Sequence, residues 1–138
     1  MAKVLQFSYT VSHPALGESS SLPYLPLTLL HQQQSVQVSG LVDSGAMVNV
    51  LPHKIGLQLG LVWAQQTVPL KLTGNLAQYE ARGVIVSAEV GTFAPVRLAF
   101  AWTAADDVPV LLGQTNFFQE FDICFLRSQS LFELKPRP

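Results

Sequence analysis

The interpretation of this sequence depends on the segment LVDSGA at positions 41–46. Its two leading apolar residues predict a buried strand that delivers the carboxyl group of Asp43 to the edge of the core. Gly45 would let the backbone approach this carboxylate or a bound molecule closely, because glycine has no side chain. Ser44 can donate a hydrogen bond to a neighbouring loop, and Ala46 keeps the turn narrow. Taken alone, the tripeptide at 43–45 also fits an ordinary turn in which an aspartate caps its own backbone.

The sequence on either side of this segment predicts strands joined by short turns. Two apolar runs, 25–30 and 36–41, flank a polar stretch and predict a hairpin whose second strand leads into Asp43. Residues 13–22 are rich in serine, glycine and proline and predict an exposed loop. A second hairpin and three further strands are expected at 84–90 with 96–102, and at 4–11, 108–112 and 131–134.

Two short helices are expected among these strands. Proline suits the first position of a helix over 52–59, although Gly56 within it lowers the helical propensity. Thr115 could cap a second helix over 115–121. Many short strands with few helices predict an all-β barrel or sandwich. A chain of 138 residues corresponds to one domain, 1–138.

A second motif, VPVLLG at 108–113, follows the first at a distance of about seventy residues. It predicts an apolar strand that ends in glycine and precedes a short helix. The two motifs together resemble the retropepsin-like aspartic protease family, in which an Asp-Thr/Ser-Gly-Ala turn is followed, after a flap hairpin, by an apolar strand ending in glycine. The match is DSGA at 43–46 and VLLG at 110–113, and NVLP at 49–52 is similar to the run after the turn.

The resemblance implies a fold and a set of site residues. The expected fold is a small closed β-barrel of the retropepsin type with one or two short helices, and Asp43 is the expected catalytic residue. The residues expected to support or brace the catalytic turn are Ser44, Gly45, Ala46, Leu112 and Gly113.

The flap is expected between two strand-like runs, 68–72 and 78–86. Its tip would hold Thr73, Gly74 and Asn75 over a bound substrate. An ordinary hairpin turn is an equally good interpretation of this loop, because it holds a single glycine.

This sequence departs from the viral members of the family at two positions. Those members often carry an acidic residue after the Ala and an arginine after the second Gly, and the two side chains pair. Here the positions hold Met47 and Gln114. Both partners are missing together, so neither leaves a charge without its counterpart. The fold assignment stands, and viral substrate preference is not expected to carry over.

Peptide hydrolysis by carboxylates needs two of them, one ionised to take a proton from water and one protonated to polarise the carbonyl. The sequence holds one Asp-Ser-Gly turn, and Asp106 and Asp107 lack a similar setting. The second carboxylate is therefore expected from Asp43 of another copy, which makes the protein a homodimer. In the family, terminal strands of the two chains interleave, and the candidates here are 5–7 and 131–134. A low charged fraction, 12%, is consistent with surface hidden in a partner.

Composition argues against several other classes of function. The eight basic residues are scattered, so no nucleic acid partner is expected. No cofactor or metal is expected, because the three histidines are spread along the chain and predict surface positions, and no phosphate-binding loop is present. Cys124 is expected in the core. There is no signal-like or membrane-length apolar run. A cytoplasmic protein, or a soluble domain of a larger one, is expected.

The sequence thus predicts an aspartic endopeptidase that acts on a peptide or protein substrate. Two alternatives remain open. One is a catalytically silent module that keeps the fold and dimerises or binds a partner. The other is a small β-barrel that binds an apolar ligand, which the positive mean hydropathy of +0.30 would suit.

Overall fold

The structure is a computed structural model that describes residues 3–138. Its described part is built mainly of strands, with two short α-helices and four 3-10 turns. The strands are β1 (Leu5–Ser8), β2 (Thr10–Val11), β3 (Ser21–Leu22), β4 (Tyr24–His31), β5 (Gln34–Val42), β6 (Asn49–Leu51), β7 (Pro69–Leu70), β8 (Ala81–Glu89), β9 (Val96–Thr103), β10 (Val110–Leu112), β11 (Phe121–Leu126) and β12 (Leu131–Pro136). The helical segments are α1 (His53–Gln58), α2 (Phe117–Glu120), η1 (Pro14–Ser20), η2 (Trp63–Gln65), η3 (Gly74–Leu76) and η4 (Arg127–Gln129).

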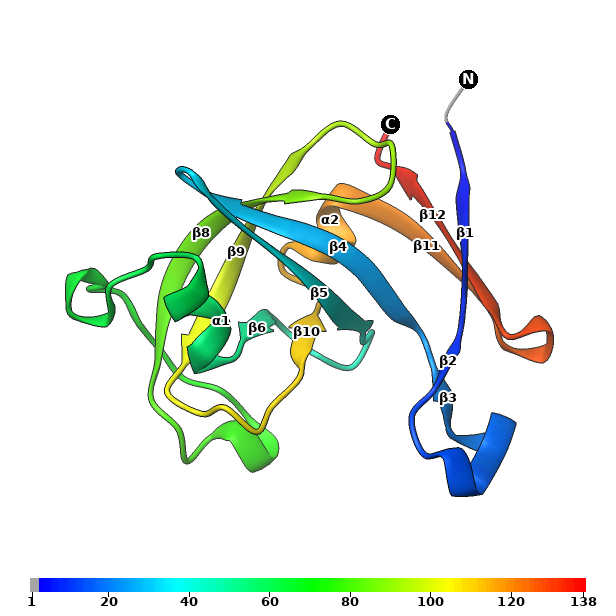
Figure 1. Cartoon of the computed structure of the whole chain (residues 1–138), viewed down its shortest axis with the longest axis horizontal. Helices are drawn as coiled ribbons and strands as arrows, with labels where there is room; N and C mark the ends of the chain where they lie inside the picture. Colours follow the sequence, from blue (N-terminus) through cyan, green and yellow to red (C-terminus); the bar gives the residue numbers. More distant parts are fainter. Residues whose placement is uncertain (1–2) are drawn as a thin grey trace.

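Six strands close into a barrel in the order β4-β5-β10-β6-β9-β8, and β8 returns to β4 through the pairs at 28–30 and 87–89. The short strand β7 pairs with the first two residues of β8, Ala81 and Arg82. Figure 1 shows β4 and β5 as a long hairpin across the molecule, with β10 beside the last part of β5. The expected all-β barrel with short helices is therefore confirmed.

The barrel interior is filled by apolar side chains that alternate along the strands. In β4, for example, Leu25, Leu27 and Leu29 point inward while their neighbours face outward, the period-two pattern of a half-buried strand. The largest fully buried side chains are Trp102, Phe100, Phe117, Phe121 and Phe132. These buried side chains pack into one cluster, which holds the strand ends that carry the site in fixed positions.

The terminal strands form a separate three-stranded sheet in the order β1-β12-β11. Leu5 pairs with Leu134, and Phe7 pairs with Phe132, within the same chain. The two segments expected to interleave with a partner chain thus already pair with each other. Phe132 and Leu134 are fully buried, which fixes this sheet to the barrel.

Several sequence-based expectations for this region were wrong. The expected strand 4–11 is broken at Tyr9 into β1 and β2. Cys124 is exposed, not in the core, because it lies on the polar outer face of β11 opposite Glu133. The expected helix over 115–121 is limited to α2, and its N-cap residue is Asn116 in place of Thr115, without a capping hydrogen bond from the side chain.

The projection formed by β2, η1 and β3 is held against the terminal sheet by polar contacts (Figure 1). Arg127 donates to the Ser21 hydroxyl at 2.6 Å and lies over the ring of Tyr9. Hydrogen bonds from Ser130 and Ser21, helped by the charge of Arg127, hold the pKa of Glu18 below its usual range. These bonds favour the charged carboxylate, so their contribution is present at neutral pH and is lost as the pH falls through the lowered pKa.

Helix α1 packs its glycine directly on a tryptophan. A Cβ atom at Gly56 would lie 2.2 Å from Cε2 and Nε1 of Trp102. The same indole donates a hydrogen bond to the His53 carbonyl at 3.1 Å. The glycine that weakens the helical propensity is therefore needed for this contact.

His53 is not a surface histidine, contrary to expectation. Its ring stacks on Trp102 and meets Trp63 edge-on, each at 5.5 Å between ring centroids. Its Nδ1 atom is buried without a hydrogen-bond partner. His53 therefore packs against two tryptophan rings at the start of α1, and this aromatic contact keeps it from the surface.

We expect Gly56→Ala to lower the free energy of unfolding by about 1–3 kcal/mol, because the new methyl group overlaps a rigid, buried ring. The matched control is Gly83→Ala, where a Cβ would lie 3.6 Å from its nearest neighbours in Val68 and Leu70. Urea denaturation followed by tryptophan fluorescence would compare the two. Equal stabilities for the two variants would contradict the close packing of Trp102 on α1.

Candidate active site

The turn after β5 is fixed by backbone hydrogen bonds at both ends of Asp43. Its N–H donates to the Leu112 carbonyl at 3.0 Å, and its carbonyl accepts from the Ala46 N–H at 3.1 Å. The side-chain Oδ1 atom accepts a hydrogen bond from the Gly45 N–H at 2.9 Å. This last bond is the one expected of an aspartate that caps its own turn. The geometry of the turn alone therefore fits both an ordinary capping aspartate and a catalytic one. The surroundings of the turn distinguish the two.

The second sequence motif lies directly against this turn. Strand β10 runs parallel to β5, with Leu112 beside Val42, and antiparallel to β6. A Cβ atom at Gly113 would lie 2.7 Å from the carbonyl oxygens of Ala46 and Val48. Only glycine allows the two backbones to approach this closely. The structure thus places Leu112 and Gly113 in contact with the turn.

Asn49 connects β6 to the end of β10, to β9 and to the residue before α2 through one buried side chain. Its Oδ1 atom accepts from the Gly113 N–H at 2.8 Å, and its Nδ2 atom donates to the Ala99 carbonyl at 2.9 Å and to Oδ1 of Asn116 at 3.1 Å. The residue is fully buried, so these bonds replace water entirely. Sequence analysis had not assigned a role to Asn49. The available signal was a polar residue at the start of the apolar run NVL.

Gln114 occupies the position where viral members often carry arginine. Its Nε2 atom donates to the Ser44 carbonyl at 2.8 Å, and its N–H donates to the Ala46 carbonyl at 2.9 Å. A neutral amide therefore ties the second motif to the turn. Met47, at the position of the missing acidic partner, is exposed.

A cavity of about 210 Å³ opens over Asp43. The residues that line it come from the turn, β6, β10 and the segment after β7: Asp43, Ala46, Met47, Val48, Val50, Lys71, Leu72, Thr73, Leu76 and Leu111. The half-buried carboxylate thus lies at the edge of a hollow with mostly apolar walls. This setting is typical of a binding site and is not required by an ordinary turn.

The segment expected to form the flap lies between β7 and β8. Strand β7 pairs with the start of β8, as the two arms of the flap would. Between them, Thr73 lines the cavity over Asp43, whereas Gly74 and Asn75 belong to η3 and do not line it. Of the three expected tip residues, only Thr73 therefore lines the cavity over Asp43.

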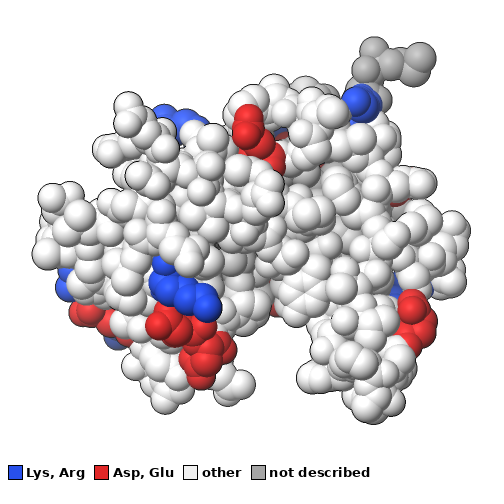
Figure 2. All heavy atoms as spheres, viewed as in Figure 1, with Lys and Arg blue, Asp and Glu red and all other residues white. Residues whose placement is uncertain are grey.

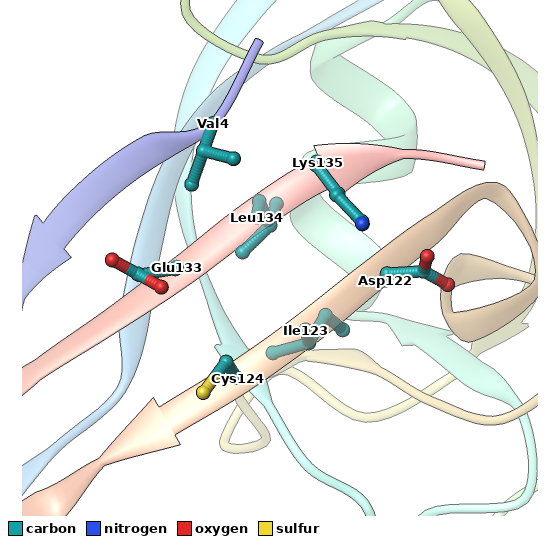
Figure 3. Close-up of a pocket in the computed structure, with 7 residues that line it drawn as sticks. All are labelled: Val4, Asp122, Ile123, Cys124, Glu133, Leu134 and Lys135. Atoms are coloured by element: carbon teal, nitrogen blue, oxygen red, sulfur yellow. The ribbon is translucent and has the colours of Figure 1, made fainter. Parts of the chain in front are cut away.

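A separate hollow of about 240 Å³ lies on the terminal sheet (Figure 3). It shares no lining residue with the cavity over Asp43. Cys124 and Glu133 lie side by side there on β11 and β12, with Asp122 and Lys135 as the next cross-strand pair. Its mixed charges and lone thiol do not form a recognisable reactive group.

Within residues 3–138, no three side chains of histidine, cysteine, aspartate or glutamate are grouped in a way that could hold a metal ion. No helix in the described part of the chain is long and apolar enough to cross a membrane. Figure 2 shows the charged side chains of one face in a few small groups separated by wide uncharged surface.

The fold is similar to solved structures of retropepsin-like proteins. A retropepsin-like aspartic protease from Rickettsia conorii aligns over 99% of this chain and 94% of its own, with a TM-score of 0.67 and 14% identity. The retroviral protease-like domain of Ddi1 from Leishmania major aligns over 85% of this chain and 94% of its own, with a TM-score of 0.59 and 15% identity. No protein-family model and no curated protein matches the sequence. These similarities show a retropepsin-like fold.

We expect Asn49→Ala to lower the free energy of unfolding by about 2–4 kcal/mol, because it leaves the buried Gly113 N–H and the Ala99 carbonyl without partners. Asn75→Ala, at an exposed position of η3, is the matched control and should change stability by less than about 0.5 kcal/mol. Chemical denaturation would measure both. A loss below 1 kcal/mol at position 49 would show that Asn49 does not hold the turn against β10.

Proposed function

We propose that this chain is one half of a homodimeric aspartic endopeptidase. The two Asp43 carboxylates, one from each subunit, would activate the water that hydrolyses a peptide bond. The observation that carries the proposal is the position of Asp43: its carboxylate lies at the edge of an open cavity, beneath a flap-like segment, in a retropepsin-like barrel. An enzyme that binds an extended peptide needs these features together, and a capping aspartate needs none of them.

The chemistry follows from two carboxyl groups that share one proton. Two carboxylates in contact do not readily both ionise, so the pair shares one proton in its active form. The ionised member takes a proton from water, and the resulting nucleophile attacks the carbonyl carbon of the scissile bond. The protonated member donates to the carbonyl oxygen and stabilises the charge that develops there.

A single chain does not supply the second carboxylate. Among the described residues that line the cavity, Asp43 is the one carboxylate. Asp106 is engaged elsewhere, since its Oδ1 atom accepts a hydrogen bond from the Lys54 N–H at 2.8 Å, at the start of α1. A two-fold axis beside the turn would bring Asp43 of a second copy to the first.

The surrounding residues would act by holding the catalytic turn and the substrate in place. Ser44, Gly45 and Ala46 hold the turn, and Leu112 and Gly113 brace it from β10. The segment with Thr73, Gly74 and Asn75 would close over the substrate. We take residues 1–138 as one protease domain that needs neither a cofactor nor a nucleic acid partner and that acts on a peptide in the cytoplasm or as part of a larger protein.

The two alternatives differ in what the structure offers them. A catalytically silent module with this fold would keep the turn and the dimer but would not cleave peptides. A barrel that binds an apolar ligand needs internal space, and buried side chains occupy the interior of this one in its described part.

Asp43→Asn should abolish cleavage and leave the fold intact, because the amide cannot carry the shared proton. The measurement is the release of fluorophore from a quenched peptide library, with circular dichroism as the check on folding. Asp107→Asn, at an exposed loop position, is the matched control and should cleave normally. Turnover by purified, folded Asp43→Asn protein would move catalysis to another site, and no cleavage by the unmodified protein would favour the silent module.

The dependence of kcat/KM on pH should be bell-shaped, with dimer content measured in parallel by sedimentation. At low pH both carboxyls are protonated and no base remains. At high pH both are ionised, so the acid is lost and the two turns repel each other. A rate that rises steadily into alkaline pH while the dimer persists would be incompatible with a pair that works through one shared proton. Cleavage by a strict monomer would exclude the two-chain site.

A further inference from the structure

The projection formed by residues 10–22 carries apolar side chains that its own chain leaves uncovered. Leu16, in the 3-10 turns at its outer end, exposes 63% of its surface, and Val11 and Leu22 on its two strands expose 40% and 38%. None of the seven residues of η1 is buried. Figure 1 shows the projection standing apart from the barrel. Apolar side chains gathered on one projecting element are typical of a contact surface.

The projection is a braced element and not a loose loop. Strands β2 and β3 pair at its inner end, and the Ser20 hydroxyl donates to the Gly17 carbonyl at 2.8 Å within the 3-10 turns. Arg127 in η4 donates to the Glu18 carbonyl at 3.3 Å and to the Ser21 hydroxyl at 2.6 Å. A surface that is already ordered loses little conformational entropy when it binds, so this bracing favours a docking role.

The inner end of the projection lies beside the catalytic turn. Pro23 follows β3, and its carbonyl accepts a hydrogen bond from the Val42 N–H at 3.0 Å. Tyr24, the next residue, is the cross-strand partner of Leu41. Neighbouring strands are about 5 Å apart, so the projection begins one strand spacing from the residue that precedes Asp43.

The proposed pairing of two Asp43 carboxyl groups determines where a second chain lies. Carboxyl groups that share a proton are in contact, so the two-fold axis passes between them and close to each turn. The start of the projection is therefore close to this axis. In Figure 1 the projection and the segment with η3 extend on the same side of the barrel, with the end of β5 between them, and Figure 2 shows a recess there.

The charges of the projection suit a contact between identical chains. Within residues 10–22, Glu18 is the one charged residue, and its carboxylate accepts hydrogen bonds from Ser21 and Ser130. A two-fold contact brings like charges to each other, so a surface without free charge avoids repulsion. The terminal segments 5–7 and 131–134 pair with each other within one chain, so they are not free to interleave with a partner. The dimer therefore needs a further contact near the axis.

We propose that the projection docks on a second copy of this chain and holds together the dimer that pairs the two Asp43 residues. The proposal rests on the protease function proposed above. The occupant is a second copy because the projection begins beside the residue before Asp43, where the axis passes. Leu16 is the anchor, since it is the most exposed apolar side chain of the projection, and each subunit contributes one.

Sedimentation at a series of protein concentrations measures the dissociation constant of the dimer. We expect Leu16→Ser to raise this constant at least about tenfold, because two leucines per dimer lose their apolar contact. Leu16→Met keeps the apolar volume and should stay within about threefold of the unmodified protein. Leu57→Ser, at a leucine of α1 that is 52% exposed, is the matched control and should leave the constant unchanged. An unchanged dimer in Leu16→Ser, or a strict monomer in the unmodified protein, would overturn the proposal.

Cleavage of a quenched peptide at the same protein concentrations separates this proposal from the protease function. Leu16→Ser should reach the same kcat at saturating protein, and its half-maximal activity should shift to higher concentration by the same factor as the dissociation constant. A weaker dimer without this shift in an active protein would mean that the projection joins copies elsewhere, and would overturn the proposal. If Leu16→Ser weakens the dimer but no protein cleaves peptides, the docking surface stands and the protease function fails. If the unmodified protein cleaves peptides and Leu16→Ser dimerises equally well, the docking surface fails and the protease function stands.

Discussion

The contact between Gly113 and the carbonyl oxygens of Ala46 and Val48 constrains the rest of the site. It requires a residue without a side chain at the end of β10, and it brings the second sequence motif against the first. Once the two backbones are this close, the Gly113 N–H has no access to water, and Asn49 supplies its partner from within the core. The position of Asp43 follows, because its own N–H bonds to the residue before Gly113.

The parts of the fold that could be predicted from the sequence are those that depend on the pattern of neighbouring residues. Alternation of apolar and polar residues placed the β4–β5 and β8–β9 hairpins, and proline marked the start of α1. The parts it missed depend on distant partners. Strand β6 has only three residues, and it is a strand because β10 and β9 lie on its two sides. The exposure of Cys124 depends on which face of β11 meets the barrel, and an apolar stretch in the sequence does not specify that face.

The candidate site shows the same division. The residues of the turn and of the second motif could be named because each motif is short and contiguous. Asn49 could not be assigned, because its role is defined by Gly113, Ala99 and Asn116, which lie far along the chain. A hairpin was expected at the flap. Only Thr73 among its three tip residues lines the cavity, and this depends on how η3 is wound.

The amide of Gln114 has a consequence for the conditions under which the turn keeps its shape. Every bond described here between the turn and β10 is neutral: the Gln114 side chain to the Ser44 carbonyl, the Gln114 N–H to the Ala46 carbonyl and the Asp43 N–H to the Leu112 carbonyl. An ion pair in this place would weaken as salt screens it and as its acid is titrated. Neutral hydrogen bonds do neither, so the link between the turn and β10 is insensitive to ionic strength. Changes in acidity act on the carboxyl groups and on the bond that Asp43 accepts from the Gly45 N–H, rather than on this link.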